Sequence, residues 1–187
     1  MTRTTRTTRS ARSARLLLAG LAALALAVAP AAAANAAAAP LASCSYDLGT
    51  ASLVCVDPGE DLNAAVLAEQ HLVVIGPGAQ RSSATPAAPG TGARATYVQT
   101  QLFDDAGYGG AVFQITNSGA CNGSTVYQFG PLSSVGWAGR VSSFKSFAGC
   151  TTKIWSGPAY SGSSFGYQVN ASSVGAMNDL ANSVTIK

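Results

Sequence analysis

Apolar and polar residues alternate over short stretches from residue 97 to residue 187, and clusters of glycine, asparagine and serine separate these stretches. Short alternating runs that are rich in β-branched and aromatic residues are typical of strands in all-β sandwiches. This region also holds 13 of the 14 aromatic residues, so we expect it to bury the main core. The pattern predicts strands at 97–103, 111–116, 125–129, 140–147, 152–155, 165–169 and 182–186.

The pattern before residue 76 is different. Residues 43–56 form two alternating runs around a turn at 47–50, which predicts a hairpin. Residues 61–70 begin with an acid and carry apolar residues at helical spacing, which predicts a short helix, and residues 71–75 predict a short buried strand. We therefore expect a small module at 43–75, and the sequence leaves open whether it packs on the rest.

A linker is predicted between these two regions. Residues 76–95 contain no large apolar residue and are rich in glycine, proline, alanine, serine and threonine. Such a composition is typical of flexible linkers. It predicts a boundary near residue 95, with the β-rich domain at 96–187.

Residues 1–42 have the pattern of a secretory signal peptide followed by an alanine-rich leader. Five regularly spaced arginines precede an apolar run of 14 residues at 16–29, and A-x-A cleavage options follow. The run is shorter than the roughly 20 residues that a membrane span needs, so we expect secretion and no stable membrane insertion. An uncleaved anchor, lengthened by the alanines, is the alternative.

Removal of this leader changes the charge of the protein. The whole chain has a formal net charge of +3, but all five leader arginines are lost, which leaves six basic and eight acidic residues and a net charge of −2. A mildly acidic protein lacks the basic surface that nucleic acids require. We therefore expect no nucleic-acid partner and no direct action on anionic membranes.

Four cysteines remain after the leader, and an even number in an exported chain predicts two disulfides. Nearest neighbours would pair Cys44 with Cys55 and Cys121 with Cys150, although three connectivities fit the sequence. Loop closure by these pairs would contribute roughly 3 and 3.5 kcal/mol. An alternative exists, because Leu-Ala-Ser-Cys at 41–44 has the form of a lipoprotein cleavage box that would place Cys44 at the cell surface.

A nine-residue pattern occurs twice, as LFDDAGYGG at 102–110 and IWSGPAYSG at 154–162. A hydroxyl-bearing strand follows each copy, with Ser143 in the first and Ser183 in the second. Two similar units in tandem predict a domain of two related halves. An aromatic residue, a tyrosine five positions later and a glycine two beyond it recur with a constant offset: Phe103, Tyr108 and Gly110, then Trp155, Tyr160 and Gly162.

The repeated pattern resembles the Greek key motif of the βγ-crystallins over residues 97–187. The resemblance implies an all-β, βγ-crystallin-like double Greek key sandwich, preceded here by the small disulfide-closed module. It also implies that the aromatic residues pack over a folded-back hairpin and that the glycine takes a conformation forbidden to a side chain. The two serines, Ser143 and Ser183, would then hydrogen-bond the hairpins.

Calcium is the cofactor that this resemblance implies. Calcium-binding βγ-crystallins carry an Asn/Asp-Asn/Asp-x-x-Ser/Thr-Ser segment in each Greek key, and two segments share two sites. The first segment here, 138–143, keeps its serines and has lost both acid or amide positions, whereas the second, 178–183, keeps Asn178 and Asp179 but has Asn182 in place of a hydroxyl. A structural remnant, in which Ser142, Ser143 and Ser183 only brace the hairpins, is therefore expected, with one weak site made by Asn178, Asp179 and Ser142 as the alternative.

Catalytic patterns are weak, and we expect no enzyme. Residues 162–166 match G-x-S-x-G by letters, but a nucleophile elbow needs a strand-turn-helix and a later histidine, and the one histidine, His71, comes earlier. Asp104 and Asp105 form an acidic pair inside the first hairpin, where acids commonly serve turns.

The leading functional interpretation is a secreted, non-enzymatic βγ-crystallin-like protein with a structural or stress-protective role. Secreted bacterial metalloproteinase inhibitors share the fold, so a proteinase inhibitor that uses the loop Asn117–Gly123, pinned by Cys121, is the alternative, with an extracellular protease as its partner. A killer-toxin-like antimicrobial protein is a second alternative. A shared fold does not choose between these functions.

Overall fold

The computed structural model describes residues 41–77 and 92–187; the predicted leader and most of the predicted linker lie outside these residues. The described chain is mostly strand, with one α-helix, α1 (Leu62–Gln70), which is too short to cross a membrane. The strands are β1 (Ser43–Asp47), β2 (Ser52–Val56), β3 (Leu72–Ile75), β4 (Arg94–Asp105), β5 (Gly109–Asn117), β6 (Tyr127–Phe129), β7 (Ser143–Ser146), β8 (Thr152–Trp155), β9 (Ser164–Gln168), β10 (Asn170–Ala171) and β11 (Ser183–Ile186).

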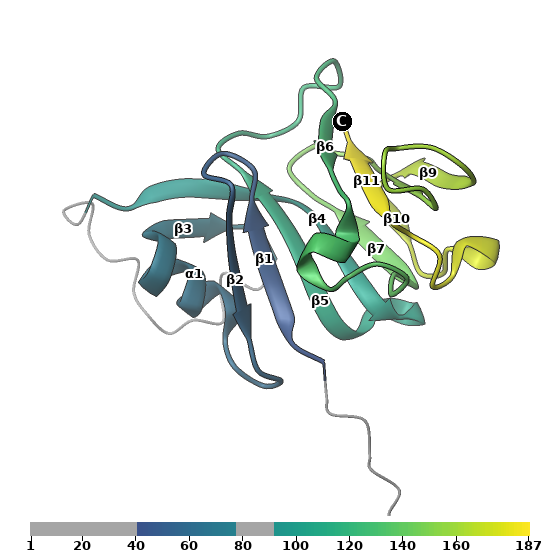
Figure 1. Ribbon diagram of the computed structural model, residues 1–187. Helices are drawn as coiled ribbons and strands as arrows, with labels where there is room; N and C mark the ends of the chain where they lie inside the picture. Colours follow the sequence, from purple (N-terminus) through teal and green to yellow (C-terminus); the bar gives the residue numbers. More distant parts are fainter. Residues whose placement is uncertain (1–40, 78–91) are drawn as a thin grey trace, which may run out of the picture. The chain divides into compact units, whose positions relative to one another are not determined.

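The strands form two sheets that exchange one strand each (Figure 1). The first sheet has the order β10-β7-β4-β5-β1-β2, with β3 also paired to β4, and the second has the order β6-β11-β8-β9. Strands β4 to β7 form the first Greek key, and its third strand, β6, lies in the second sheet. Strands β8 to β11 form the second key, and its third strand, β10, lies in the first sheet. This reciprocal exchange confirms the predicted double Greek key sandwich.

Each Greek key is closed by one buried serine, as predicted. The hydroxyl of Ser143 accepts a hydrogen bond from the Tyr108 amide at 3.0 Å and donates to the Asp105 carbonyl at 2.6 Å. In the second key Ser183 accepts from the Tyr160 amide at 3.0 Å and donates to the Gly157 carbonyl at 2.6 Å. The last strand of each key is therefore fastened to the hairpin between its first two strands.

The glycines of the repeat permit the tight hairpins. Gly110 and Gly162 have φ angles of +73° and +79°, which favour glycine. A Cβ atom on Gly162 would also lie 2.5 Å from the Ser156 hydroxyl. In the first hairpin the rings of Phe103 and Tyr108 meet edge to face, with centroids 5.7 Å apart. The glycines of both hairpins and the ring contact of the first hairpin therefore have the structural role that the resemblance implied.

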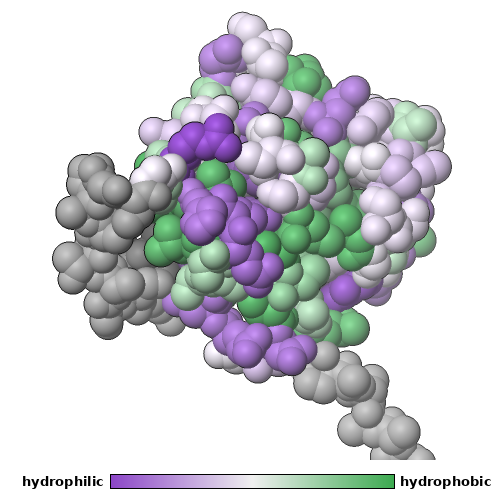
Figure 2. All heavy atoms as spheres, turned by 60° about the vertical axis from the view of Figure 1, so that its left-hand side comes forward, coloured by the Kyte–Doolittle hydropathy of each residue, from purple (hydrophilic) through white to green (hydrophobic). Residues whose placement is uncertain are grey.

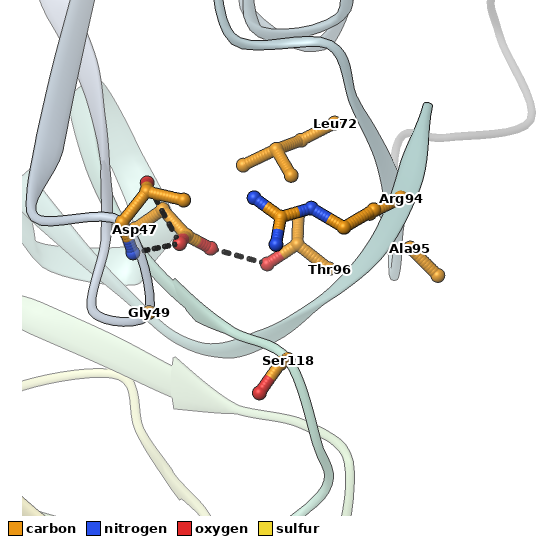
Figure 3. Close-up of a pocket in the computed structure, with 8 residues that line it drawn as sticks. Asp47, Gly49, Leu72, Arg94, Ala95, Thr96 and Ser118 are labelled. Atoms are coloured by element: carbon orange, nitrogen blue, oxygen red, sulfur yellow. Dashed lines mark hydrogen bonds between the residues drawn. The ribbon is translucent and has the colours of Figure 1, made fainter. Parts of the chain in front are cut away.

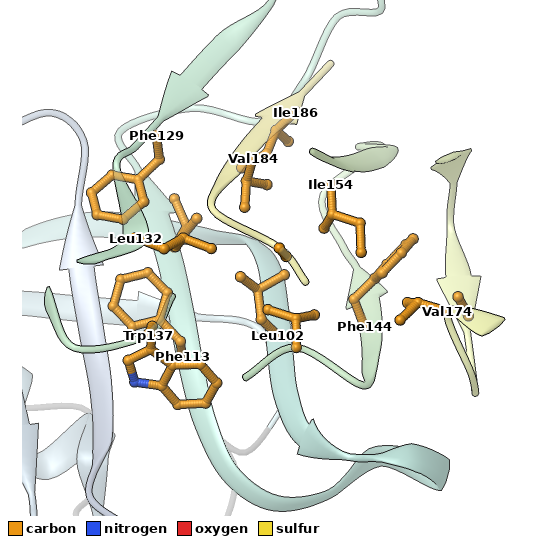
Figure 4. Close-up of a cluster of buried hydrophobic side chains, with 14 of the residues drawn as sticks. Leu102, Phe113, Phe129, Leu132, Trp137, Phe144, Ile154, Val174, Val184 and Ile186 are labelled. Carbon is orange, nitrogen blue, oxygen red and sulfur yellow. The ribbon is translucent and has the colours of Figure 1, made fainter. Parts of the chain in front are cut away.

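The main core lies between the two sheets (Figure 4). Alternate residues of β4, β5 and β7 point inward from the first sheet, and those of β8 and β11 from the second, because successive side chains of a strand face opposite ways. Trp137, in the connection between β6 and β7, is 1 % exposed and packs on Phe113 with ring centroids 5.5 Å apart. The largest fully buried apolar members are Trp137, Phe113, Phe144, Leu102, Ile115, Leu132, Ile154 and Ile186.

Residues 43–75 extend the first sheet, which answers the question that the sequence left open. Strand β1 runs parallel to β5, with Cys44 opposite Phe113 and Tyr46 opposite Ile115, and β3 runs parallel to the first residues of β4. Cys44 belongs to the main core and Tyr46 packs against it. The β-rich region also begins earlier than predicted, because β4 starts at Arg94 and includes the predicted boundary near residue 95.

Helix α1 covers a second, smaller core on the other face of this sheet. Its one fully buried residue, Val66, lies in a cluster of apolar side chains: Val54, Val66, Leu72, Val74 and Val98. The Asp61 carboxylate caps the helix by accepting from the amides of Asn63 and Ala64. Val98 comes from β4, so this small core also depends on the β-rich region.

Both predicted disulfides are present. Cys44–Cys55 joins β1 to β2, and Cys121–Cys150 joins the loop after β5 to the turn between β7 and β8. No free cysteine occurs among the described residues. The disulfides therefore fasten the N-terminal hairpin and the first Greek key, one each.

A buried carboxylate joins the N-terminal segment to the Greek keys. Asp47, at the end of β1, is 2 % exposed. Its Oδ2 accepts from the hydroxyls of Thr96 on β4 and Thr116 on β5, at 2.5 and 2.9 Å, and its Oδ1 accepts from the amide and hydroxyl of Thr50. Burial by itself would raise the pKa of Asp47, but these hydrogen bonds outweigh it and hold the pKa below 3.8. Three strands thus share one ionised side chain.

The serine braces predict a matched pair of destabilised variants. Ser143→Ala and Ser183→Ala each leave a partly buried amide and carbonyl without their serine partner, so each should lower the free energy of unfolding by about 1–3 kcal/mol. Ser163→Ala is the control, since Ser163 is exposed and close to the second hairpin. Urea denaturation measures all three. Equal stability of the two brace variants and the control would contradict the proposed role.

The Asp47 hydrogen bonds predict an acid-sensitive fold. A carboxylate with a lowered pKa stabilises the fold above its ordinary pKa, and the contribution is lost as the pH falls through the lowered value. Asp47→Asn should cost about 2–3 kcal/mol at pH 7, and it should lose less stability than the unsubstituted protein between pH 5 and pH 2. Asp57→Asn, an exposed acid, is the control. Parallel pH curves for the protein and Asp47→Asn would refute this account.

Candidate functional site

The two segments proposed to hold calcium, 138–143 and 178–183, lie against each other. The amide of Gly139 donates to the Ala181 carbonyl at 2.8 Å, and the amide of Asp179 donates to the Val141 carbonyl at 3.2 Å. Equivalent positions of the two segments thus make reciprocal bonds. The two Greek keys therefore meet at this pair of segments, as a shared metal site would require.

All three predicted ligand residues come together at one end of this pair. The Ser142 hydroxyl donates to Oδ1 of Asp179 at 3.2 Å, and the side-chain amide of Asn178 donates to Oδ2 of Asp179 at 2.6 Å. Ser142 is 5 % exposed, whereas Asp179 is exposed to solvent. The groups that meet here are one carboxylate, one hydroxyl and one amide, all from residues singled out by sequence.

The other end of the pair has no equivalent ligand set. Gly139 stands where Asp179 stands in the second segment, and both have positive φ angles, +70° and +56°. Asn182 occupies the position in the second segment that corresponds to Ser142 in the first. Its side-chain amide donates to the Ser156 carbonyl at 3.1 Å. Within residues 41–77 and 92–187, no three histidine, cysteine, aspartate or glutamate side chains are grouped to hold a metal. Only one of the two sites therefore keeps a carboxylate.

The first segment itself carries one basic residue, Arg140. Arg140 donates from Nε to Oδ1 of Asp104 at 2.8 Å and from Nη1 to the Gly136 carbonyl at 3.2 Å, and its guanidinium lies 4.0 Å from the centre of the Trp137 ring. Asp104, predicted to serve a turn, therefore forms an ion pair instead. The pairing joins the first hairpin to the connection between β6 and β7.

The loop proposed for protease inhibition is exposed and anchored. Its carbonyl at Gly119 accepts from the Gln99 side chain at 3.1 Å, and the amide of Cys121 donates to the Ala148 carbonyl at 3.0 Å beside the Cys121–Cys150 disulfide. Oδ1 of Asn122 accepts from the amides at 124 and 125, which closes a turn. These anchors fit a rigid loop, and inhibition of a thermolysin-type protease stays a prediction.

The serine motif at 162–166 does not form a nucleophile elbow. Ser164 is the first residue of strand β9, so the strand-turn-helix that exposes a nucleophile is replaced by a hairpin strand. His71 ends α1 with a φ angle of +55°, and its amide donates to the Leu67 carbonyl at 3.2 Å. Ser164 is therefore part of a strand, and His71 ends a helix.

Sequence reasoning missed a pocket beside Asp47. A cavity of about 180 Å³ is lined by the end of β1 and its turn, the start of β3, the start of β4 and the residue after β5 (Figure 3). Its polar residues are Asp47, Thr50, Arg94, Thr96 and Ser118. They come from three separate stretches, so no local motif marks them. The Asp-Leu-Gly-Thr turn at 47–50 was visible in the sequence only as a turn.

Similar chains are found among solved structures. No family model matches the sequence, and no curated protein matches it. Among solved structures, a βγ-crystallin domain from Clostridium beijerinckii is 20% identical, with a TM-score of 0.38 over 47% of this chain and 95% of that one. A βγ-crystallin domain from Flavobacterium johnsoniae is 18% identical, with a TM-score of 0.37 over 47% and 92%. The N-terminal domain of Protein S is 13% identical, with a TM-score of 0.39 over 48% and 94%.

The likeness to these bacterial domains concerns the fold alone, and it covers about half of the present chain. The additional strands β1 to β3 and helix α1 enlarge the first sheet on the side of β5 and β4. From the order of its strands and its two serine braces, the protein is a βγ-crystallin-like double Greek key sandwich with an N-terminal extension built into its first sheet.

Proposed function

We propose that this is a secreted, non-enzymatic protein with a structural role, and that it binds calcium weakly at Asp179. The contact between Ser142 and Asp179 carries the proposal, because it places one ligand from each Greek key at a single point. A cation held there would join the two keys. Secretion supports the same proposal, because extracellular fluids supply calcium at concentrations that weak sites require.

The ligand set limits the expected affinity. Calcium prefers six to eight oxygen ligands, and sites with few carboxylates bind at about 10⁻⁴ to 10⁻³ M. Here the one carboxylate of the segment pair, that of Asp179, already accepts from Ser142 and Asn178. Calcium would have to displace these two donors, which lowers the net gain. We therefore expect weak binding and a small stabilisation.

A structural role also fits how the polar side chains are used. Ser143 and Ser183 brace the hairpins, Asp47 joins three strands, and Asp104 pairs with Arg140. Each of these groups makes at least one hydrogen bond to a residue that is distant in the sequence. Such a use of polar residues supports a protein whose stability is its main property, in line with a stress-protective role.

Calcium addition gives a direct test of the metal proposal. With a dissociation constant of about 1 mM, 10 mM calcium would stabilise the fold by about 1.4 kcal/mol. That corresponds to a rise in Tm of roughly 3–6 °C for a protein of this size. Melting curves of residues 43–187 with calcium, and with magnesium for comparison, measure it.

Matched variants locate the effect. Asp179→Asn keeps a residue that tolerates positive φ and removes the charge, so it should abolish the calcium shift, whereas Asp57→Asn should leave it unchanged. Gly139→Asp combined with Asn182→Ser restores the ligand pattern of the second site and should enlarge the rise in Tm that calcium causes. No shift at 10 mM calcium, or a shift that survives in Asp179→Asn, would remove the metal proposal.

A further inference from the structure

We propose that the cavity beside Asp47 binds a small zwitterion that carries an ammonium group and a carboxylate, such as a free α-amino acid. The cavity lies where the N-terminal extension meets β4 and β5, away from the Ser142–Asp179 contact. Three features carry the proposal: the size of the cavity, the direction of the hydroxyl groups beside Asp47 and the Arg94 guanidinium that turns into the cavity (Figure 3).

The hydroxyl groups on the Asp47 wall are oriented as acceptors. An ionised carboxylate can only accept hydrogen bonds. The hydroxyl groups of Thr50 and Thr96 therefore both donate their hydrogen bonds to Asp47, at 3.0 and 2.5 Å. Their lone pairs can accept hydrogen bonds, and the Ser52 hydroxyl donates one such bond to Thr50 at 2.6 Å. This wall therefore presents acceptors backed by a buried negative charge.

The buried charge has no cationic partner within the described chain. Asp47 is 2 % exposed, and the one ion pair in residues 41–77 and 92–187 is Arg140–Asp104. Its charge is held by the amide and hydroxyl groups that surround it, and burial without a counter-ion is costly. An ammonium group bound at the Thr50 and Thr96 oxygens would place a positive charge one hydroxyl away from Asp47 and reduce this cost.

Arg94 supplies the opposite wall. It is exposed at the start of β4, and its guanidinium turns into the cavity toward Asp47 in Figure 3 without forming an ion pair with it. A guanidinium offers five donors in a planar fork that suits a carboxylate. Ser118 adds a hydroxyl on the same cavity, and Leu72 adds an apolar surface. An anion alone would be repelled by the charge of Asp47, and a cation alone would be repelled by the charge of Arg94.

The N-terminal extension, which contributes Asp47 to the cavity, is acidic as a whole. Residues 43–75 carry five acids and no lysine or arginine, and Arg94 is the first basic residue of the described chain after them. Figure 2 turns this side forward and shows hydrophilic residues gathered over it beside apolar ones. A ligand with two opposite charges fits the boundary between the two regions. A cavity of about 180 Å³ has room for a small amino acid.

Titration with L-alanine tests the proposal. In ¹⁵N-labelled protein of residues 43–187, the amides of Thr50, Thr96 and Ser118 should shift and saturate, with a dissociation constant on the order of millimolar. Acetate and methylammonium, each carrying one of the two charges, should bind at least about tenfold more weakly than L-alanine, because each loses one charge-assisted contact.

Variants separate the two walls. Arg94→Gln should weaken L-alanine binding by about tenfold and strengthen the weak methylammonium binding, because the repulsion between two cations is lost, and Thr50→Val should weaken both. Lys187→Gln is the control for loss of one positive charge at a distant place, and it should bind as the unsubstituted protein does. The unchanged spectra of the remaining amides would show that each variant is folded. Absence of saturable shifts up to 100 mM, equal binding of acetate and L-alanine, or unaffected binding in Arg94→Gln would each overturn the proposal.

Discussion

The carboxylate of Asp47 is the interaction on which the rest of the structure depends. Four hydrogen bonds bring β1, β4 and β5 to one buried charge, and so fix the register in which the N-terminal extension meets the first Greek key. The parallel pairing of β1 with β5 then places Cys44 and Tyr46 in the main core. Without that charge, the same threonines would lack an acceptor that spans three strands.

Charged groups elsewhere are stabilised in another way. Four of the five basic residues in the described chain lie over aromatic rings, with Lys145 on Tyr108, Lys153 on Trp155 and Lys187 on Tyr167, in addition to Arg140 on Trp137. Only Arg140 also forms an ion pair. A cation–π contact holds a flexible basic side chain against an aromatic ring of the same protein. Arg94 is the exception, and it is the residue that borders the cavity.

The repeat made the Greek keys predictable, because a local pattern at 102–110 and 154–162 encodes each hairpin and its brace. The disulfides followed from nearest pairing. Strand β10, two residues long, was missed because it has no pattern of its own. The cavity and the Asp47 hydrogen bonds were missed because Thr96 and Thr116 lie 49 and 69 residues away in sequence. Only the pairing of β1 and β4 with β5 brings them together.

The central claim is that residues 43–75 and 94–187 fold as one cooperative unit. Urea denaturation with intact disulfides tests it, followed by tryptophan fluorescence for the Greek keys and by the methyl NMR signals of Val54, Val66 and Val74 for the extension. We predict a single transition at one urea concentration for both probes, because Val98 and Asp47 link the two regions. Earlier loss of the valine signals, with tryptophan fluorescence unchanged, would contradict the claim.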